Sequence, residues 1–211
     1  MSDHENFFLR KAINLDIHNK CSLQCNKCAR FDIISQIPEI TTSNFPGCPL
    51  SDKDWKSILH HFDYLNFCGQ VSDPMMHPKL SSFLSDIHLN EKYGQVHTAV
   101  SQKPIKRYIQ AFEANPNAKW IFGIDGLPKD SHKYRTNQDG EKLFEIMLEA
   151  KNILIKPPQW QYIVFKYNEN NIEESRSLAK EAGLEINFMY SARYTKDDPL
   201  KPSPEFRLDK R

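Results

Sequence analysis

A regular alternation of short β-rich runs with amphipathic helical stretches constrains the fold of this sequence more than any other feature. Apolar–polar alternation or a short apolar run predicts strands at residues 12–18, 64–69, 96–100, 119–124, 161–167 and 185–190. Apolar residues at helical spacing predict helices after Ser51, from Pro78, and at 104–115, 140–152 and 172–182. Pro78 suits a first helical turn, and Gly183 is typical of a residue that ends a helix.

Strand and helix in series are typical of a mostly parallel sheet covered by helices. A closed eight-unit barrel takes about 250 residues, whereas this sequence has 211. We therefore predict an α/β fold, an open and partial (β/α)6 barrel. No repeat or Gly/Ser linker is visible, so we expect a single domain over 1–211, with the barrel at about 11–190 and an irregular polar tail at 191–211. In such barrels the chemistry lies where the strands end.

The charge balance excludes several classes of protein. Lysine and arginine total 28 and aspartate and glutamate 27, and a net charge of +1 argues against a nonspecific nucleic-acid binder. No apolar run approaches the roughly 18 residues of a membrane span. Residues 1–10 are charged and lack the apolar stretch of a secretory signal. We therefore expect a cytoplasmic protein with neither a membrane nor a nucleic-acid partner.

Three of the five cysteines follow the first predicted strand in the motif C-x3-C-x2-C, as Cys21, Cys25 and Cys28. In a reducing compartment such a cluster indicates metal ligation rather than disulfides. Three thiolates on one loop can hold three irons of a [4Fe–4S] cluster and leave the fourth iron open to a small molecule. A structural zinc site takes four ligands, and Cys48 could be the fourth, although its Pro-Gly-Cys-Pro context lacks knuckle spacing.

The motif and its place after the first strand resemble the radical S-adenosylmethionine (SAM) superfamily. The resemblance implies that Cys21, Cys25 and Cys28 hold a [4Fe–4S] cluster whose unique iron chelates the amino and carboxylate groups of SAM. It covers residues 11–190 and is closest in motif to the peptide- and protein-modifying subgroup. No cysteine follows Cys68, so we expect no auxiliary-cluster domain. Lys27 stands where the family usually has an aromatic residue.

The end of the second predicted strand is similar to the glycine-rich "GGEP" element of that family. The resemblance implies that Gly69 and Ser72 permit close approach of the backbone to SAM, and that Asp73 receives the SAM ammonium. A carboxylate that faces an ammonium makes a charge-assisted hydrogen bond. By itself the Asp-Pro pair is more typical of an ordinary turn before a helix. The preceding cysteine motif favours the functional interpretation.

Later strand ends carry further candidates for contact with SAM. Ser101 follows the third predicted strand, where the family often has Thr-Asn-Gly. Asp125 and Arg135 resemble the "S-x-D-G … R" stretch of the peptide-modifying enzymes, in which the arginine pairs with the SAM carboxylate. Gly123 takes the place of the serine there. Asn168, after the fifth predicted strand, matches a polar position that contacts SAM in the same subgroup.

The resemblance implies an enzyme that cleaves SAM reductively to methionine and a 5′-deoxyadenosyl radical, which takes hydrogen from a substrate. An external donor such as a flavodoxin or a ferredoxin would supply the electron. The later motifs favour a peptide substrate, and a nucleoside or other small molecule is the alternative. A noncatalytic iron–sulfur or zinc module is the alternative from another class. Cys68 could return a hydrogen atom to the substrate or could be a buried small hydrophobe.

Overall fold

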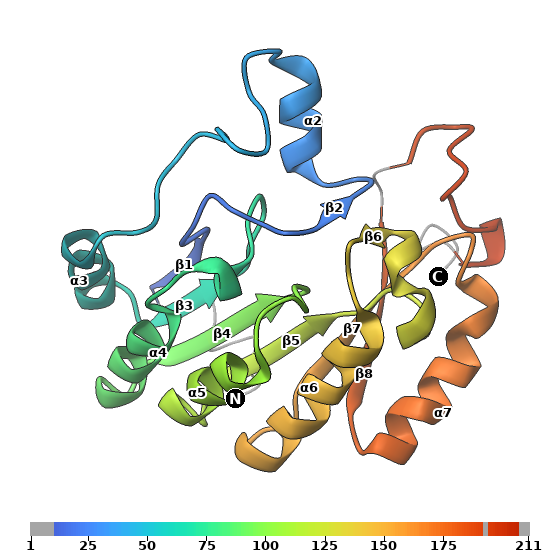
Figure 1. Cartoon of the computed structure of the whole chain (residues 1–211). Helices are drawn as coiled ribbons and strands as arrows, with labels where there is room; N and C mark the ends of the chain where they lie inside the picture. The colour runs from blue at the N-terminus through green and yellow to red at the C-terminus, as the bar shows by residue number, and fades with distance from the viewer. Residues whose placement is uncertain (1–10, 192–193, 207–211) are drawn as a thin grey trace.

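The computed structural model describes residues 11–191 and 194–206. Six parallel strands form one sheet in the order β1-β3-β4-β5-β7-β8. Within the described residues, β1 and β8 are its two edges, and the sheet is not closed into a barrel (Figure 1). The predicted open α/β fold is confirmed. The strands are β1 (Ala12–Leu15), β3 (Tyr64–Phe67), β4 (Tyr93–Thr98), β5 (Lys119–Gly123), β7 (Gln159–Val164) and β8 (Glu185–Tyr190).

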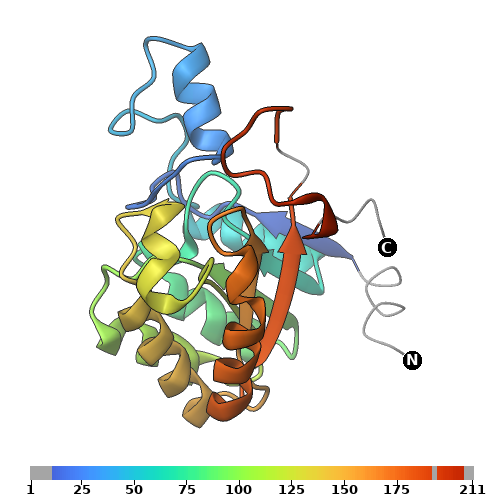
Figure 2. The same ribbon diagram turned by 90° about the vertical axis from the view of Figure 1, so that its right-hand side faces the viewer.

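At least one α-helix lies between each strand of the sheet and the next, and five of these helices cover one face of the sheet (Figures 1 and 2). They are α3 (Asp52–His61), α4 (Leu80–Leu89), α5 (Ile105–Ala114), α6 (Gly140–Ile153) and α7 (Ile172–Ala182). Three short 3-10 helices also occur in the connections, η1 (Pro74–Met76), η2 (Pro128–Lys133) and η3 (Glu169–Asn171).

Local side-chain chemistry explains where several of these helices begin and end. The Ser51 hydroxyl accepts a hydrogen bond from the Asp54 amide at 3.2 Å and caps α3. The Asp139 carboxylate does the same for α6, from the Lys142 amide at 3.0 Å. Gly183 ends α7 in the left-handed conformation with φ of 63°, as predicted, because glycine carries no Cβ penalty there.

The core lies between the helices and one face of the sheet. Alternate strand residues are buried toward the helices, among them Leu65, Phe67, Val96, Trp120, Phe122, Trp160 and Tyr162. The positions between them face the other way and are largely polar, as in Asn14, Asn66, Gln95, His97 and Gln161. Because the helices cover only one face, the polar face remains available to a site.

Two predicted strands begin earlier than the sequence pattern indicates. β4 starts at Tyr93 rather than residue 96, and β7 starts at Gln159 rather than residue 161. The sequence pattern missed these first residues because Gln95 and Gln159 are polar. Both side chains face the side of the sheet that helices α3 to α7 leave uncovered. Among the α-helices and strands of the described residues, three were not predicted: α2 (Ala29–Gln36), and the antiparallel pair formed by β2 (Gln24–Cys25) and β6 (Arg135–Thr136).

The described part of the predicted tail, 194–206, has few regular elements but is held against the fold. It contains only the short helix η4 (Pro204–Phe206). The Lys166 amide donates to the Leu200 carbonyl at 3.0 Å, and the Ser203 amide donates to the Glu169 carboxylate at 2.7 Å. Among the described residues, no helix has the length and apolar character needed to cross a membrane.

Candidate functional site

The cysteine loop lies above the C-terminal ends of the strands, between β1 and α2 (Figure 1). Cys25 belongs to β2, and Cys28 is the residue that precedes α2. The Cys28 amide donates to the Cys25 carbonyl at 3.1 Å, and the Leu23 amide donates to the Cys21 sulfur at 3.5 Å. All three thiols are free and half-buried. The N-terminus of α2 therefore faces this loop, where it favours negative charge.

The β2–β6 pair brings Arg135 to the cysteines. Cys25 is paired directly with Arg135 in this short ladder, and the Asn26 amide donates to the Tyr134 carbonyl at 3.4 Å. Residues separated by more than half of the sequence therefore lie side by side. A two-residue strand carries almost no sequence signal, so this contact could not be read from the sequence.

Arg135 is fixed by an ion pair and by the absence of a side chain at Gly123. Its Nε lies 2.7 Å from Oδ2 of the fully buried Asp125, whose Oδ1 accepts from the Ile163 amide at 2.7 Å. A Cβ atom at Gly123 would lie 2.6 Å from Nη2 of Arg135. Burial lowers the pKa of Arg135, but the negative charges of Asp125 and Cys25 raise it by more, so the pKa of Arg135 lies above its ordinary value. The guanidinium is therefore a permanent positive charge.

Asp16, directly after β1, shapes the loop at the end of β3. Its carboxylate accepts from the amides of Gln70, Val71 and Ser72 at 3.0 to 3.2 Å, and from the Ser72 hydroxyl at 2.7 Å. Gly69 allows the tight turn, since its φ is +56° and a Cβ there would lie 2.5 Å from the Ser72 carbonyl oxygen. The sequence pattern did not single out Asp16, because it placed Asp16 inside the predicted strand 12–18, whereas β1 ends at Leu15.

Asp73 joins this loop to the end of β4. Its buried carboxylate accepts from the Met75 amide at 2.9 Å, the Thr98 hydroxyl at 2.9 and 3.1 Å, and the Ala99 and Val100 amides at 2.8 and 3.2 Å. Burial raises the pKa of Asp73, and these hydrogen bonds partly oppose the rise. Both carboxylate oxygens are thus already used within the protein.

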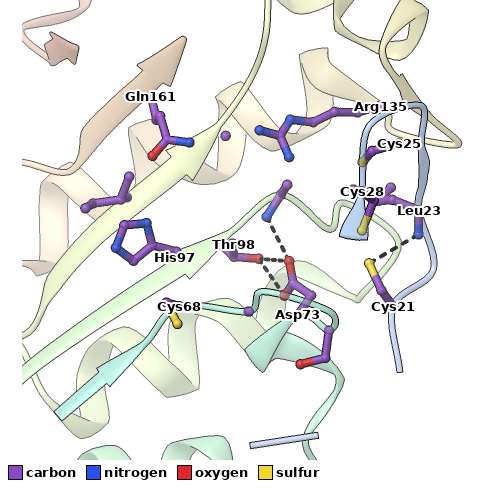
Figure 3. Close-up of a pocket in the computed structure, with 15 residues that line it drawn as sticks. Cys21, Leu23, Cys25, Cys28, Cys68, Asp73, His97, Thr98, Arg135 and Gln161 are labelled. Atoms are coloured by element: carbon purple, nitrogen blue, oxygen red, sulfur yellow. Dashed lines mark hydrogen bonds between the residues drawn. The ribbon is translucent and has the colours of Figure 1, made fainter. Parts of the chain in front are cut away.

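A cavity of about 170 Å³ brings the cysteine loop and several strand ends together. Figure 3 shows the three cysteines on one wall, Asp73 and Thr98 to the left of Cys21, and the Arg135 guanidinium pointing inward. Of the candidates predicted from the sequence, the following seven line it: Cys21, Cys25, Cys28, Gly69, Ser72, Asp73 and Arg135.

Three predicted candidates are not among the residues that line the cavity: Ser101, Asp125 and Asn168. The Ser101 hydroxyl accepts from the Asp139 amide at 2.8 Å, at the start of α6. The Asn168 side chain accepts from the Phe165 amide at 2.7 Å and donates to the Ile163 carbonyl at 3.0 Å, so it closes its own loop. Asp125 reaches the cavity only through Arg135.

Other polar lining residues were missed by the sequence analysis or left open. His97 lies on β4 and Gln161 on β7, and both face the cavity (Figure 3). Burial lowers the pKa of His97 to about 4, with a smaller effect from Lys119, so its imidazole is neutral at pH 7. Cys68 also lines the cavity and is half-buried. Polar residues at alternate positions of a predicted strand were the available signal.

The cysteine wall has the donor chemistry of a soft metal site. Burial raises the pKa of Cys21 to about 12 and that of Cys25 to about 11; Asp73 adds to the rise at Cys21, whereas Arg135 opposes it at Cys25. Metal ligation deprotonates thiols, so a bound metal group would supply the positive charge that their thiolates require. The exposed Cys48 is not among the lining residues.

In the described part of the chain, no group of three or more His, Cys, Asp or Glu side chains has a geometry that could hold a metal ion. The thiolates of an iron–sulfur cluster each bind a different iron, so their sulfurs surround the cluster instead of meeting at one ion. Cys21, Cys25 and Cys28 lie on one wall of the cavity, and the fourth lining cysteine, Cys68, lies across from them (Figure 3). Three cysteines grouped in this way fit a cluster that keeps one iron open.

Two further cations lie in or next to the cysteine loop. Lys27 Nζ lies 2.5 Å from the Asp198 carboxylate of the C-terminal segment. Figure 2 shows that segment passing beside the cysteine loop. Arg30, on α2, is buried, and burial lowers its pKa, whereas negative charge on Cys21 and Cys28 raises it.

Comparison with known proteins identifies the fold. No family model matches the sequence, and no curated protein matches it. Among solved structures, Streptococcus suis SuiB bound to precursor peptide SuiA matches with a TM-score of 0.69 and 12% identity over 92% of this chain and 42% of that chain. The anSMEcpe enzyme with bound AdoMet gives 0.66 and 12% identity over 92% of this chain and 54% of that chain.

Methylornithine synthase (PylB) also matches, with a TM-score of 0.61 and 12% identity over 97% of this chain and 60% of that chain. These structural neighbours are radical SAM enzymes. This chain therefore has the fold of radical SAM enzymes. It spans about half the length of the structures that it matches.

Proposed function

We propose that this chain is a radical SAM enzyme that binds a [4Fe–4S] cluster through Cys21, Cys25 and Cys28 and binds SAM in the adjoining cavity. The observation that carries the proposal is the convergence of the cysteine motif with Asp73 and Arg135 on one cavity at the strand ends. Neighbours of the same fold, SuiB and anSMEcpe, have been solved with SAM bound, which supports the choice of cofactor.

The residues around the cavity have separable roles in this proposal. Arg135 would pair with the SAM carboxylate, because Asp125 holds its Nε and leaves the Nη groups toward the cavity. Gly69 and Ser72 would let the backbone approach the cofactor closely. Asp73 would attract the SAM ammonium through its charge, since its oxygens already accept hydrogen bonds from the end of β4. Ser101 and Asn168 would act only by shaping the surrounding loops.

When bound, the cluster supplies the electron that splits SAM into methionine and a 5′-deoxyadenosyl radical. The chain itself would orient SAM and keep water from the reacting atoms. We propose a flavodoxin or a ferredoxin as the electron donor and the cytoplasm as the location.

For the substrate we propose a peptide. SuiB has been solved with its precursor peptide and anSMEcpe with a peptide, which supports this class. The neutral His97 and the amide of Gln161 give the cavity hydrogen-bonding groups without net charge, which suit uncharged amides. A small-molecule substrate is the second candidate, favoured by the match to methylornithine synthase.

Anaerobic reconstitution tests the proposal. The wild-type chain should hold about four irons and four sulfides, and should release 5′-deoxyadenosine from SAM with a strong reductant. Cys21→Ala, Cys25→Ala and Cys28→Ala should each lose most of the cluster. Cys48→Ala is the matched control and should keep it, because Cys48 is exposed and is not among the cavity residues.

Two outcomes would contradict the proposal. Stoichiometric zinc in place of iron, with Cys48 required to bind it, would indicate a structural zinc site. A complete cluster that never cleaves SAM, even with candidate peptides and small molecules supplied, would indicate a noncatalytic iron–sulfur module.

A further inference from the structure

Arg30 is a buried cation next to the cysteine loop, and the residue is 2% exposed. Its Nη1 donates to the Asn19 carbonyl at 2.6 Å and to the Val71 carbonyl at 3.2 Å, and its Nη2 donates to the Thr42 carbonyl at 2.9 Å. The guanidinium also lies over the Phe45 ring, 4.0 Å from its centroid. All these contacts are with neutral groups.

The charge of Arg30 has no acidic partner among residues 11–191 and 194–206, since none of their ion pairs includes it. Burying an unpaired charge is costly, and buried charges in proteins are normally paired or bound to a group of opposite sign. The other cations beside the loop are different in this respect. Arg135 is paired with Asp125, and Lys27 is paired with Asp198.

The position of Arg30 points to its counter-charge. Arg30 follows Cys28 by two residues, and its Nη1 is bonded to Asn19, two residues before Cys21. The guanidinium therefore bridges the two ends of the cysteine loop. It also contacts Val71, next to the cavity residue Ser72. Residues 21–28 include no aspartate or glutamate, so negative charge on this loop would come from the cysteine thiolates of the proposed cluster.

We propose that Arg30 is the buried counter-ion of the anionic iron–sulfur group on the cysteine loop and raises its reduction potential. The inference rests on the proposed function. A fixed positive charge stabilises the reduced cluster more than the oxidised cluster, because reduction adds a negative charge. In this role Arg30 is a positioning residue that acts through the cluster and does not touch the substrate.

A redox titration of the reconstituted protein, followed by EPR, tests this role. Arg30→Gln should make reduction of the cluster at least tenfold less favourable. For one electron this corresponds to a midpoint potential lower by about 59 mV. Arg30→Lys keeps the charge and should stay near the wild type. The matched control is Lys20→Gln, which removes an exposed charge next to Cys21 and should shift the potential much less.

A second variant leaves Arg30 in place, in case Arg30→Gln does not fold. Thr42 is exposed and its backbone carbonyl accepts from Nη2, so Thr42→Asp adds a carboxylate at a residue that contacts the guanidinium and leaves the backbone acceptor in place. It should lower the midpoint potential in the same direction.

Iron and sulfide are measured for every protein, so that loss of the cluster is separated from a change in its potential. Equal potentials for the wild type, Arg30→Gln and Thr42→Asp at full iron content would overturn the inference alone. So would equal shifts in Arg30→Lys and Arg30→Gln, which would assign the effect to hydrogen-bond geometry instead of charge. A wild-type chain without iron and sulfide would overturn the proposed function as well.

Discussion

Replacing Asp125 by asparagine should destabilise the protein by more than most polar substitutions, because it removes the counter-charge of Arg135. Asp125 is fully buried and the Arg135 side chain is 13% exposed. The carboxylate uses one oxygen for the Ile163 amide and the other for Arg135 Nε, each at 2.7 Å. An asparagine amide has a single oxygen, so it can serve only one of these two donors.

The magnitude follows from the burial of the pair. Breaking a buried ion pair by removing one partner costs about 3–5 kcal/mol, and the contact of Arg135 with the cavity places this pair at the lower end. A loss of about 3 kcal/mol, with a urea dependence of about 2 kcal/mol per molar, lowers the unfolding midpoint by about 1.5 M. Urea denaturation of the metal-free protein, followed by circular dichroism, measures it directly.

The exposed pair between Lys133 and Asp130 provides a matched control. Its nitrogen–oxygen distance is 2.8 Å, close to that of the buried pair, but the two side chains are 49% and 23% exposed. Asp130→Asn should therefore cost less than about 1 kcal/mol. If Asp125→Asn and Asp130→Asn lowered the free energy of unfolding equally, the argument from burial would be refuted.

Three further predictions concern the cavity. Gly123→Ala places a Cβ 2.6 Å from Arg135 Nη2 and should displace the guanidinium. Equilibrium dialysis should show SAM binding that is about tenfold weaker, or 1.4 kcal/mol. Unchanged affinity at full iron content would contradict this prediction. Asp73→Ala leaves three donors at the end of β4 without an acceptor. Each buried donor left without an acceptor costs about 1–3 kcal/mol of stability. The variant should unfold at a lower urea concentration and bind SAM less tightly, while it keeps its iron. The pKa of His97 is about 4 in the folded protein against 6.5 unfolded, so its stabilising effect is complete above pH 6.5 and is lost as pH falls toward 4. Between those pH values the wild type should lose up to about 3 kcal/mol relative to His97→Gln in urea titrations, and parallel pH profiles would disprove the shift.

Local patterns in the sequence predicted most of the fold. The spacing of apolar residues identified the strands of the sheet and the helices between them, and capping residues such as Ser51 and Gly183 fixed helix ends. The rule that parallel strands end at one edge predicted that cysteines and later motifs would meet, and seven of the predicted residues line one cavity. Each of these inferences depends on residues that are near each other in the sequence.

The tertiary structure decided which polar residues face the site and which hold the loops around it. Ser101 and Asn168 directly follow predicted strands, but their side chains form hydrogen bonds with nearby backbone and do not line the cavity. Arg135 does not directly follow a predicted strand, and it does line the cavity. Arg135 reaches the cavity because β6 pairs with β2. The buried Arg30 donates hydrogen bonds to backbone carbonyls of three separate segments of the chain. Such contacts join residues far apart in the chain through two or three hydrogen bonds. They leave no periodic pattern in the sequence, because the register of long-range pairing is set only when the whole sheet has formed.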